Sequence, residues 1–186
     1  MSGTNDRLVA WTEDELGVTG RVLDVVRAPA AVLSTDGVRV DPTAPEVVQL
    51  AADLVATMRV SPGCVGLAAP QVGVGSKVFC VDVTDHPKTR TGHGTFVLCN
   101  AEVVEATRKE KAREGCMSVP DLTGDVKRGS RVLVRGQLPG TGEEIEVRTD
   151  GFEARCLQHE IDHCDGLLFL DRVAGAHAVY ARQTYL

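Results

Sequence analysis

The sequence predicts an α+β fold in a single domain that covers residues 1–186, and three observations support this prediction. The length is typical of one domain. Apolar residues recur at helical spacing in two segments, 44–58 and 151–165. Alternating apolar and polar residues predict strands between these helices, and neither a repeat nor a low-complexity segment interrupts the pattern. One α+β domain accounts for both kinds of pattern.

The first quarter of the chain predicts one irregular segment and one helix. Residues 12–27 are expected to be helical or mixed. A clearer helix is predicted over 44–58, because its apolar side chains recur every three or four residues and would face the core. Thr43 stands at the cap position of this helix, and Pro45 lies in its first turn, where proline is favoured.

Four strands are predicted, at residues 77–83, 96–104, 131–138 and 143–149. The last two form a β-hairpin around a Pro-Gly-Thr-Gly turn. The first two are separated by a polar loop, residues 84–94, whose His86 and His93 are expected to face solvent. The charged run 108–113 is expected to be a solvated stretch, and the tail 174–186 is too weakly patterned to predict a role.

The second helix, residues 151–165, carries the most informative motif of the chain. Asp150 is expected to cap its N-terminus with Glu153 as the capping-box partner, and Gly166 stands where the helix would end. Within this helix, residues 158–163 read Gln-His-Glu-Ile-Asp-His. Two imidazoles four residues apart, with a carboxylate directly after the first, are typical of a metal site with a base.

On a helix, His159 and His163 share one face with Cβ atoms about 5–6 Å apart. Both can therefore bind one metal ion at about 2.0–2.1 Å. Glu160 is rotated about 100° from His159, so we expect it to act on a water molecule at the metal rather than on the metal itself. Two ordinary core or surface histidines are the alternative interpretation, but the capped helix and the glutamate favour a metal site.

The third ligand has to come from upstream. No glutamate follows Glu160, and Phe169 stands where proteases of the metzincin type have a third histidine. Cys156 lies about 10 Å from His163 along the helix axis, and Cys164 points round the helix. Cys116 remains. It could be a small buried residue, the commonest fate of a free cysteine, or it could complete a His-His-Cys set that keeps an open position for water.

Three segments resemble the signatures of the peptide deformylases, the metalloenzymes that remove the formyl group from the N-terminal methionine of new bacterial polypeptides. The family patterns are G-x-G-L-A-A-x-Q, E-G-C-L-S and Q-H-E-x-D-H-x-x-G, and the matching segments are Gly66 to Gln71, Glu114 to Ser118 and Gln158 to Gly166. The resemblance spans about residues 20–172. Three departures touch no ligand: Cys64 replaces a glycine, and Met117 and Cys164 each replace a leucine.

The resemblance implies antiparallel or mixed sheets packed around a central helix that bears the His-Glu-x-x-His motif. It implies three metal ligands, Cys116, His159 and His163. It also implies that Glu160 is the catalytic base, and that the Gln71 side-chain amide and the Met117 backbone N–H stabilise the developing oxyanion.

Five further residues are expected at the peptide-binding groove. Gly66 and Gly115 are interpreted as places where a Cβ would obstruct an approaching peptide backbone. Val65, Phe152 and Cys156 correspond to the pocket for the methionine side chain, although core packing is an equally ordinary interpretation of each.

Metal identity and partners follow from chemistry and from the resemblance. A His-His-Cys set is compatible with Fe²⁺, Zn²⁺, Co²⁺ or Ni²⁺, and the resemblance implies Fe²⁺ with the others able to substitute. It also implies that the substrates are N-formylmethionyl nascent peptides and that the protein works beside the ribosome, where any docking would use a local surface patch.

A net charge of -6 does not predict nucleic-acid binding by the surface as a whole. No stretch approaches the roughly 20 apolar residues that span a bilayer. Six cysteines without a C-x-x-C pair predict reduced thiols in the cytoplasm.

Two other functions remain open. A zinc endopeptidase is favoured by the His-Glu-x-x-His motif alone, but the missing downstream ligand and the short chain count against it. A non-catalytic, metal-stabilised binding module would need a closed four-ligand site without a poised glutamate.

Overall fold

The computed structural model describes residues 13–183 and has an α+β fold, which confirms the predicted class. The strands are β1 Gly66–Ala68, β2 Val78–Val81, β3 Phe96–Cys116, β4 Val119–Gln137, β5 Glu144–Asp150 and β6 Val179–Ala181. The α-helices are α1 Glu13–Leu16, α2 Pro45–Val60 and α3 Gly151–Cys164, and four short 3-10 helices are η1 Ala31–Ser34, η2 Ala69–Val72, η3 Phe169–Arg172 and η4 Ala176–Ala178.

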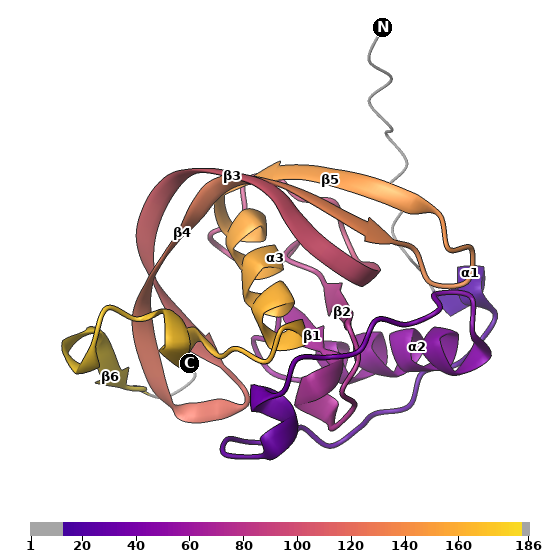
Figure 1. Ribbon diagram of the computed structural model, residues 1–186, viewed down its shortest axis with the longest axis horizontal. Helices are drawn as coiled ribbons and strands as arrows, with labels where there is room; N and C mark the ends of the chain where they lie inside the picture. The colour runs from indigo at the N-terminus through magenta and orange to yellow at the C-terminus, as the bar shows by residue number, and fades with distance from the viewer. Residues whose placement is uncertain (1–12, 184–186) are drawn as a thin grey trace, which may run out of the picture.

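The six strands form one sheet in the order β1-β2-β3-β4-β5, with β6 paired to β4. Each strand pairing is antiparallel. Figure 1 shows α3 inside the curve made by β3, β4 and β5, so the helix that bears the motif is central, as expected. Among the described residues, no helix is long and apolar enough to cross a membrane.

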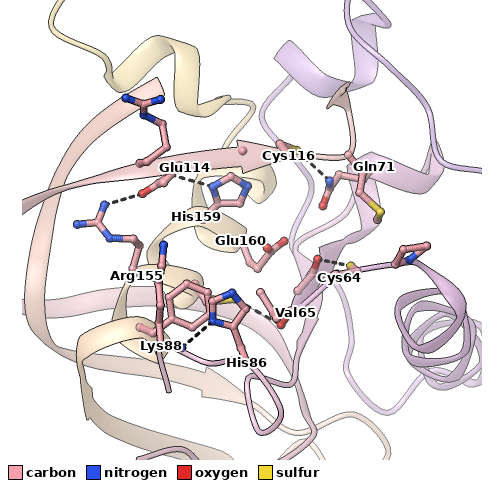
Figure 2. A pocket seen from close by; sticks show the side chains of 18 of the residues that line it. Cys64, Val65, Gln71, His86, Lys88, Glu114, Cys116, Arg155, His159 and Glu160 are labelled. Carbon is pink, nitrogen blue, oxygen red and sulfur yellow. Dashed lines mark hydrogen bonds and ion pairs between the residues drawn. The ribbon is translucent and has the colours of Figure 1, made fainter. Parts of the chain in front are cut away.

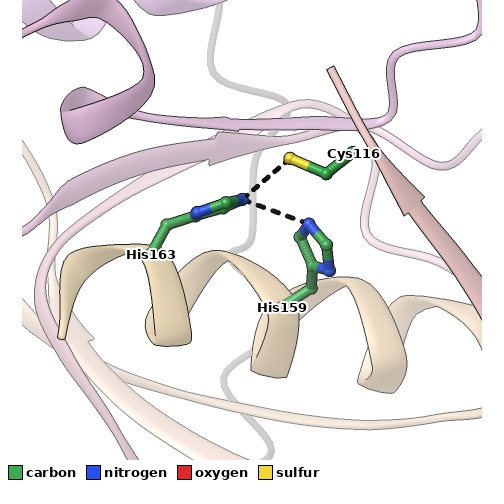
Figure 3. A group of neighbouring side chains, drawn as sticks. All are labelled: Cys116, His159 and His163. Carbon is green, nitrogen blue, oxygen red and sulfur yellow. Dashed lines mark hydrogen bonds between the residues drawn. The ribbon is translucent and has the colours of Figure 1, made fainter. Parts of the chain in front are cut away.

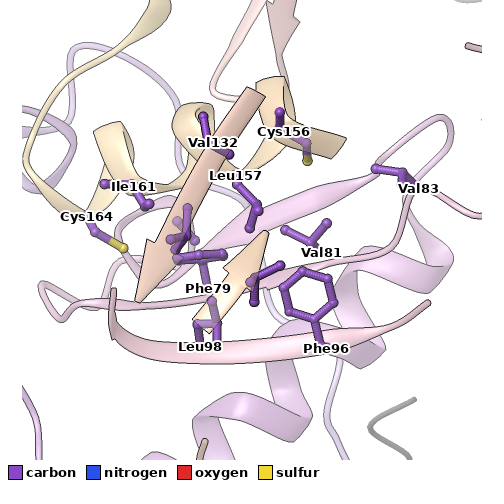
Figure 4. Close-up of a cluster of buried hydrophobic side chains, with 14 of the residues drawn as sticks. Phe79, Val81, Val83, Phe96, Leu98, Val132, Cys156, Leu157, Ile161 and Cys164 are labelled. Atoms are coloured by element: carbon purple, nitrogen blue, oxygen red, sulfur yellow. The ribbon is translucent and has the colours of Figure 1, made fainter. Parts of the chain in front are cut away.

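Two apolar clusters fix α3 and α2 on opposite sides of β2. Phe79 and Val81 pack toward the inner face of α3, together with Leu157 and Ile161 (Figure 4). The alternate β2 residues, Val78 and Cys80, belong to the cluster around α2. Successive side chains of a strand point to opposite faces, so β2 is buried on both. This packing fixes the position of α3, the helix that carries the motif, against the sheet.

The predicted helices largely match the structure, and the mismatches have local causes. Residues 18–27 are not helical, because their backbone is bound by α2 instead: the Arg21 N–H donates to Asp53 at 2.8 Å. Residue 12 lies outside the described part. The N-cap of α2 is Ala44 rather than Thr43. The Thr43 hydroxyl donates instead to Asp41 at 2.8 Å.

Strands β3 and β4 extend beyond the predicted ranges. The charged run 108–113 is exposed, as expected, but it lies inside β3. Register shifts occur between Cys99 and Glu102 and between Val103 and Glu105. Residues 102–111 are all exposed, so this part of the strand lacks the alternation of buried and exposed side chains that would reveal it in the sequence.

The start of α3 differs from the predicted capping box. Asp150 occupies the N-cap position but makes no side-chain cap hydrogen bond. Glu153 is fully buried and accepts hydrogen bonds from the Thr149 hydroxyl at 2.6 Å and the His93 N–H at 2.8 Å. His86 stacks on Phe152 with ring centroids 4.0 Å apart. The loop histidines therefore pack on α3, and the prediction that they simply face solvent was wrong.

Candidate metal centre and active site

The two motif histidines and Cys116 converge on one point. The Nε2 atoms of His159 and His163 are 3.2 Å apart, and Nε2 of His163 lies 3.3 Å from the Cys116 Sγ. All three ligand atoms lie within 4.8 Å of one another. Figure 3 shows both imidazoles rising from α3 toward the thiol at the end of β3. Two nitrogens and one sulfur at this spacing fit a divalent transition-metal ion.

The position of Cys116 depends on a tight turn and a bulge. Met117 and Ser118 form the turn that joins β3 to β4, and the register shifts between Gly115 and Cys116. A bulge of this kind re-aims a side chain. Burial alone would raise the pKa of the Cys116 thiol, but the His163 and His159 imidazoles bring that pKa well below its ordinary value. The group is therefore disposed to be a thiolate, the form that binds metal.

A buried carboxylate orients His159. The Nδ1 of His159 lies 3.0 Å from Glu114, so its Nε2 is left to face the metal position. Glu114 also receives the Arg128 guanidinium at 2.6 Å and Arg155 at 2.8 Å. Burial would raise the pKa of Glu114, but His159 and Arg128 hold it well below its usual range. The carboxylate stays charged and fixes the ring.

Asp162 precedes His163 directly, but neither motif histidine is among its hydrogen-bond partners within residues 13–183. Its carboxylate instead accepts from Arg128 at 2.7 Å and Arg172 at 2.7 Å. Because Arg128 also holds Glu114, Asp162 supports the ring of His159 only through two intermediaries. The network joins β3, β4, α3 and η3 beneath the metal position.

Glu160 lies beside the three convergent ligand atoms but is not among them. Its side chain is buried, and its Oε2 has no hydrogen-bond partner within residues 13–183. Burial raises the pKa of Glu160 to about 7, although His159 and His163 oppose that rise. A Cβ on Gly66 would meet Glu160 Oε1 at 2.5 Å and Cys156 Sγ at 2.9 Å. Glycine is thus required at residue 66 partly to seat this carboxylate.

Gln71 points its amide at the same place. Its Oε1 accepts the Ala68 N–H at 2.9 Å, which fixes the orientation of the amide. Its Nε2 then donates toward the Cys116 Sγ at 3.3 Å and the Ser118 hydroxyl at 3.4 Å. The arrangement leaves an N–H donor directed at the region of the thiol.

One pocket brings together ten of the eleven residues predicted for the site (Figure 2): Val65, Gly66, Gln71, Gly115, Cys116, Met117, Phe152, Cys156, His159 and Glu160. The eleventh, His163, is buried and does not line this pocket. The pocket is also lined by residues that the sequence did not reveal, including His86, Lys88, Arg113, Arg155 and Arg182. Among these residues, only Arg155 could have been placed near the site from the sequence, because it precedes His159 by one helical turn.

The polypeptide deformylase family model matches residues 22–178 of this chain. A peptide deformylase from Halothermothrix orenii is 41% identical over 152 residues, which cover 82% of this chain and 94% of that protein. A peptide deformylase from Desulforudis audaxviator is 42% identical over 163 residues, or 87% of this chain and 98% of that protein.

Solved structures agree with these sequence relatives. The crystal structure of peptide deformylase from Thermotoga maritima superposes with a TM-score of 0.74 at 30% identity, and the match covers 83% of this chain and 99% of that one. A crystal structure of the class I type b enzyme from Acinetobacter baumannii, with Met-Ala-Ser bound, gives 0.75 at 33% identity, covering 82% of this chain and 100% of that one.

Proposed function

Because this chain belongs to the polypeptide deformylase family, we propose that it hydrolyses the formamide bond of N-formylmethionyl polypeptides and releases formate. The observation that carries this proposal is the convergence of the Cys116 thiol on the two histidines of the His-Glu-x-x-His helix. Three ligands with a buried glutamate beside them favour an open catalytic site over a closed structural one.

Cys116, His159 and His163 would hold one divalent ion. When bound, such an ion polarises the formyl carbonyl and lowers the pKa of water at its open position. We infer Fe²⁺ as the native ion from the family resemblance. Zn²⁺, Ni²⁺ and Co²⁺ suit the same donor set, so any of them could substitute.

Glu160 would take the proton of the attacking water and return it to the departing amine. The support is its position next to the ligands, with one carboxylate oxygen that no described residue occupies. The Gln71 amide and the Met117 backbone N–H would stabilise the negative charge that develops on the formyl oxygen. The direction of the Gln71 Nε2 toward the thiol supports this role.

The peptide would lie in the pocket between β1 and the end of β3. Val65, Phe152 and Cys156 line it and would receive the methionine side chain, and the peptide backbone would pass beside Gly66 and Gly115, which also line the pocket. The tripeptide bound to the Acinetobacter baumannii enzyme also begins with methionine, which favours this assignment.

We further infer that residues 1–186 act as one catalytic domain in the cytoplasm. Nascent chains at the ribosome surface would be its substrates, because formylated N-termini arise there. Any docking on the ribosome would use a local patch, since the net charge of the chain is -6.

The test compares three peptides: a formyl-Met peptide, the same peptide without the formyl group, and a longer unformylated peptide in which only internal peptide bonds could be cleaved. Formate release and peptide cleavage are both measured. We expect formate from the first and no cleavage of the other two. Cleavage of an internal bond would instead identify an endopeptidase. No turnover with any metal loaded under anaerobic conditions would favour a binding module.

The identity of the ion has a separate test. An iron-loaded sample should lose activity in air faster than a nickel- or zinc-loaded one, because Fe²⁺ and its thiolate ligand are both oxidisable. Activity is followed over time in air and under argon. Equal decay for the three metals would contradict iron as the air-sensitive native ion.

A further inference from the structure

Strand β6 leads directly into Arg182, which lines the pocket. It pairs antiparallel with β4, with Ala181 opposite Leu122 and Val179 opposite Gly124. The next residue, Arg182, donates its backbone N–H to the Asp121 carbonyl at 2.8 Å. Its guanidinium lies directly over Gly115, where a Cβ would collide with it, and donates to the Pro120 carbonyl at 3.4 Å. An arginine from the end of the described chain is thus placed one residue from the ligand Cys116.

Side-chain contacts hold β6 on the rim. The ring of Tyr180 lies under the Arg113 guanidinium, 3.6 Å from centroid to Cζ. The Tyr180 hydroxyl donates to Asp125 at 3.3 Å, and Arg113 donates to the same carboxylate at 2.7 Å. The cation–π contact and the shared carboxylate connect β6 to β3. These contacts also fix the position of Arg182, which follows β6 directly.

The mouth of the pocket is cationic, although the chain as a whole is acidic. Four lining residues bear positive side chains: Lys88, Arg113, Arg155 and Arg182. The two lining carboxylates, Glu114 and Glu160, are buried. Glu114 is paired with Arg128 and Arg155, and Arg113 is paired with Asp125. Positive side chains still outnumber carboxylates around the mouth, although the net charge of the whole chain is -6.

We propose that Arg182, supported by this cationic rim, selects formylated peptides that carry an acidic side chain in the two residues after methionine. This inference rests on the proposed function. With the methionine side chain between Val65 and Cys156, the following residues must leave the pocket across the rim. A guanidinium there attracts a carboxylate by its charge and can donate a charge-assisted hydrogen bond to it. Charge complementarity of this kind sets specificity between peptides that share the same reacting group.

The test uses three peptides with amidated C-termini: formyl-Met-Asp-Ala, formyl-Met-Ala-Ala and formyl-Met-Lys-Ala. We expect kcat/KM of the metal-loaded wild-type enzyme to be about tenfold higher for the aspartate peptide than for the lysine peptide, a typical factor for one charge contact. The preference should weaken as salt is raised, because a rim contact is screened.

Arg182→Ala should bring the ratio of the aspartate to the lysine peptide close to one, and Arg182→Glu should reverse it. The matched control is Arg148→Ala, which removes an exposed arginine on β5 that pairs with Glu105 away from the pocket. This control should keep the wild-type ratio.

Two results would overturn the inference: an unchanged ratio in Arg182→Glu, or an equal fall in kcat/KM for all three peptides. The second would make Arg182 a general support of the site. Neither can be confused with failure of the proposed function, in which the wild-type enzyme releases no formate from any of the peptides.

Discussion

Glu160 is the residue whose replacement separates metal binding from use of the metal. Glutamine at this position keeps the shape of the side chain and cannot accept the proton. We expect Glu160→Gln to fold and retain its ion, but to lose at least the roughly 10²- to 10⁴-fold that general acid–base catalysis usually contributes. The measurement is metal content by elemental analysis beside turnover of a formyl-Met peptide.

His163→Ala is the matched control, because it removes a ligand and should lose the ion itself. A metal-free Glu160→Gln would make Glu160 a ligand or a structural support. A fully active Glu160→Gln would place the base on another residue.

The six cysteines should differ sharply in their response to replacement. Cys116→Ala should abolish activity and weaken metal retention, because Cys116 is the one cysteine whose Sγ faces both imidazoles. Cys80→Ala is the matched control: its thiol is fully buried in β2, 3.7 Å from the Met58 sulfur. That change should alter the free energy of unfolding at most. Equal loss of metal from both variants, measured by elemental analysis, would show that the ligand set is wrong.

The convergence of the two histidines was predictable because both occupy one short motif whose helical geometry is known in advance. Cys116 was one possible third ligand from the sequence, and Gln71 became a candidate only through the family resemblance. The approach of Cys116 to the histidines depends on a bulge that a single sequence does not show. Arg182 gave no signal at all. Its position follows from the pairing of β6 with residues far earlier in the chain, and a three-residue strand has no periodicity to detect.

At the scale of elements, the loop 84–94 is joined to α3 by an ion pair that titrates. His93 Nδ1 lies 2.6 Å from the buried Glu153, whose hydrogen bond raises the pKa of His93. Burial would raise the pKa of Glu153, but the hydrogen bonds from His93 and Thr149 lower it. The imidazolium therefore stabilises the fold below its unfolded pKa of about 6.5, and this contribution is lost as pH rises through the higher folded value. The carboxylate contributes above its unfolded pKa of about 4.3, and its contribution is lost as pH falls through the lower folded value.

His93→Ala should accordingly destabilise the metal-loaded protein most between about pH 4.5 and 6.5, where both groups are charged. The expected loss at pH 6 is about 1.5 kcal/mol, the low end for a charged hydrogen bond, because the imidazole is partly exposed. The loss should be smaller at pH 9. Urea unfolding at both pH values measures it, and His177→Ala, which removes an exposed histidine on η4, is the control. A pH-independent loss would show that His93 acts by packing alone.

Element types were predicted better than element lengths. The core helices α2 and α3 keep one apolar face throughout, so their periodicity was visible. The end of β3 was not, because it forms an exposed ribbon with β4 in which Lys109, Glu110 and Lys111 all stay in solvent. Strand pairing, rather than burial of alternate side chains, makes that segment extended.

At the scale of the whole molecule, metal binding should be coupled to thermal stability. The ligands come from the end of β3 and from α3, and they meet only in the folded chain. An ion present at 1,000 times its dissociation constant adds about 4 kcal/mol to the free energy of unfolding. For a chain of this length, that shifts Tm by about 10 °C. We expect calorimetry of chelated and metal-loaded protein to show this difference.

His163→Ala provides the control for the thermal shift, since its Tm should hardly respond to added metal. A wild-type Tm that is equal with and without metal would mean that the three side chains do not hold an ion under these conditions.

The attachment of β6 to the pocket rim makes residue 183 a tether point. Any segment joined after it starts beside the entrance, so its local concentration there is on the order of millimolar. Such a segment would compete with free peptide, most strongly if it were acidic, and the competition would grow weaker as the linker lengthened. Comparisons of peptide selectivity between variants therefore require identical sequences downstream of residue 183, and a cleavable affinity tag placed there would change the apparent KM when it is removed.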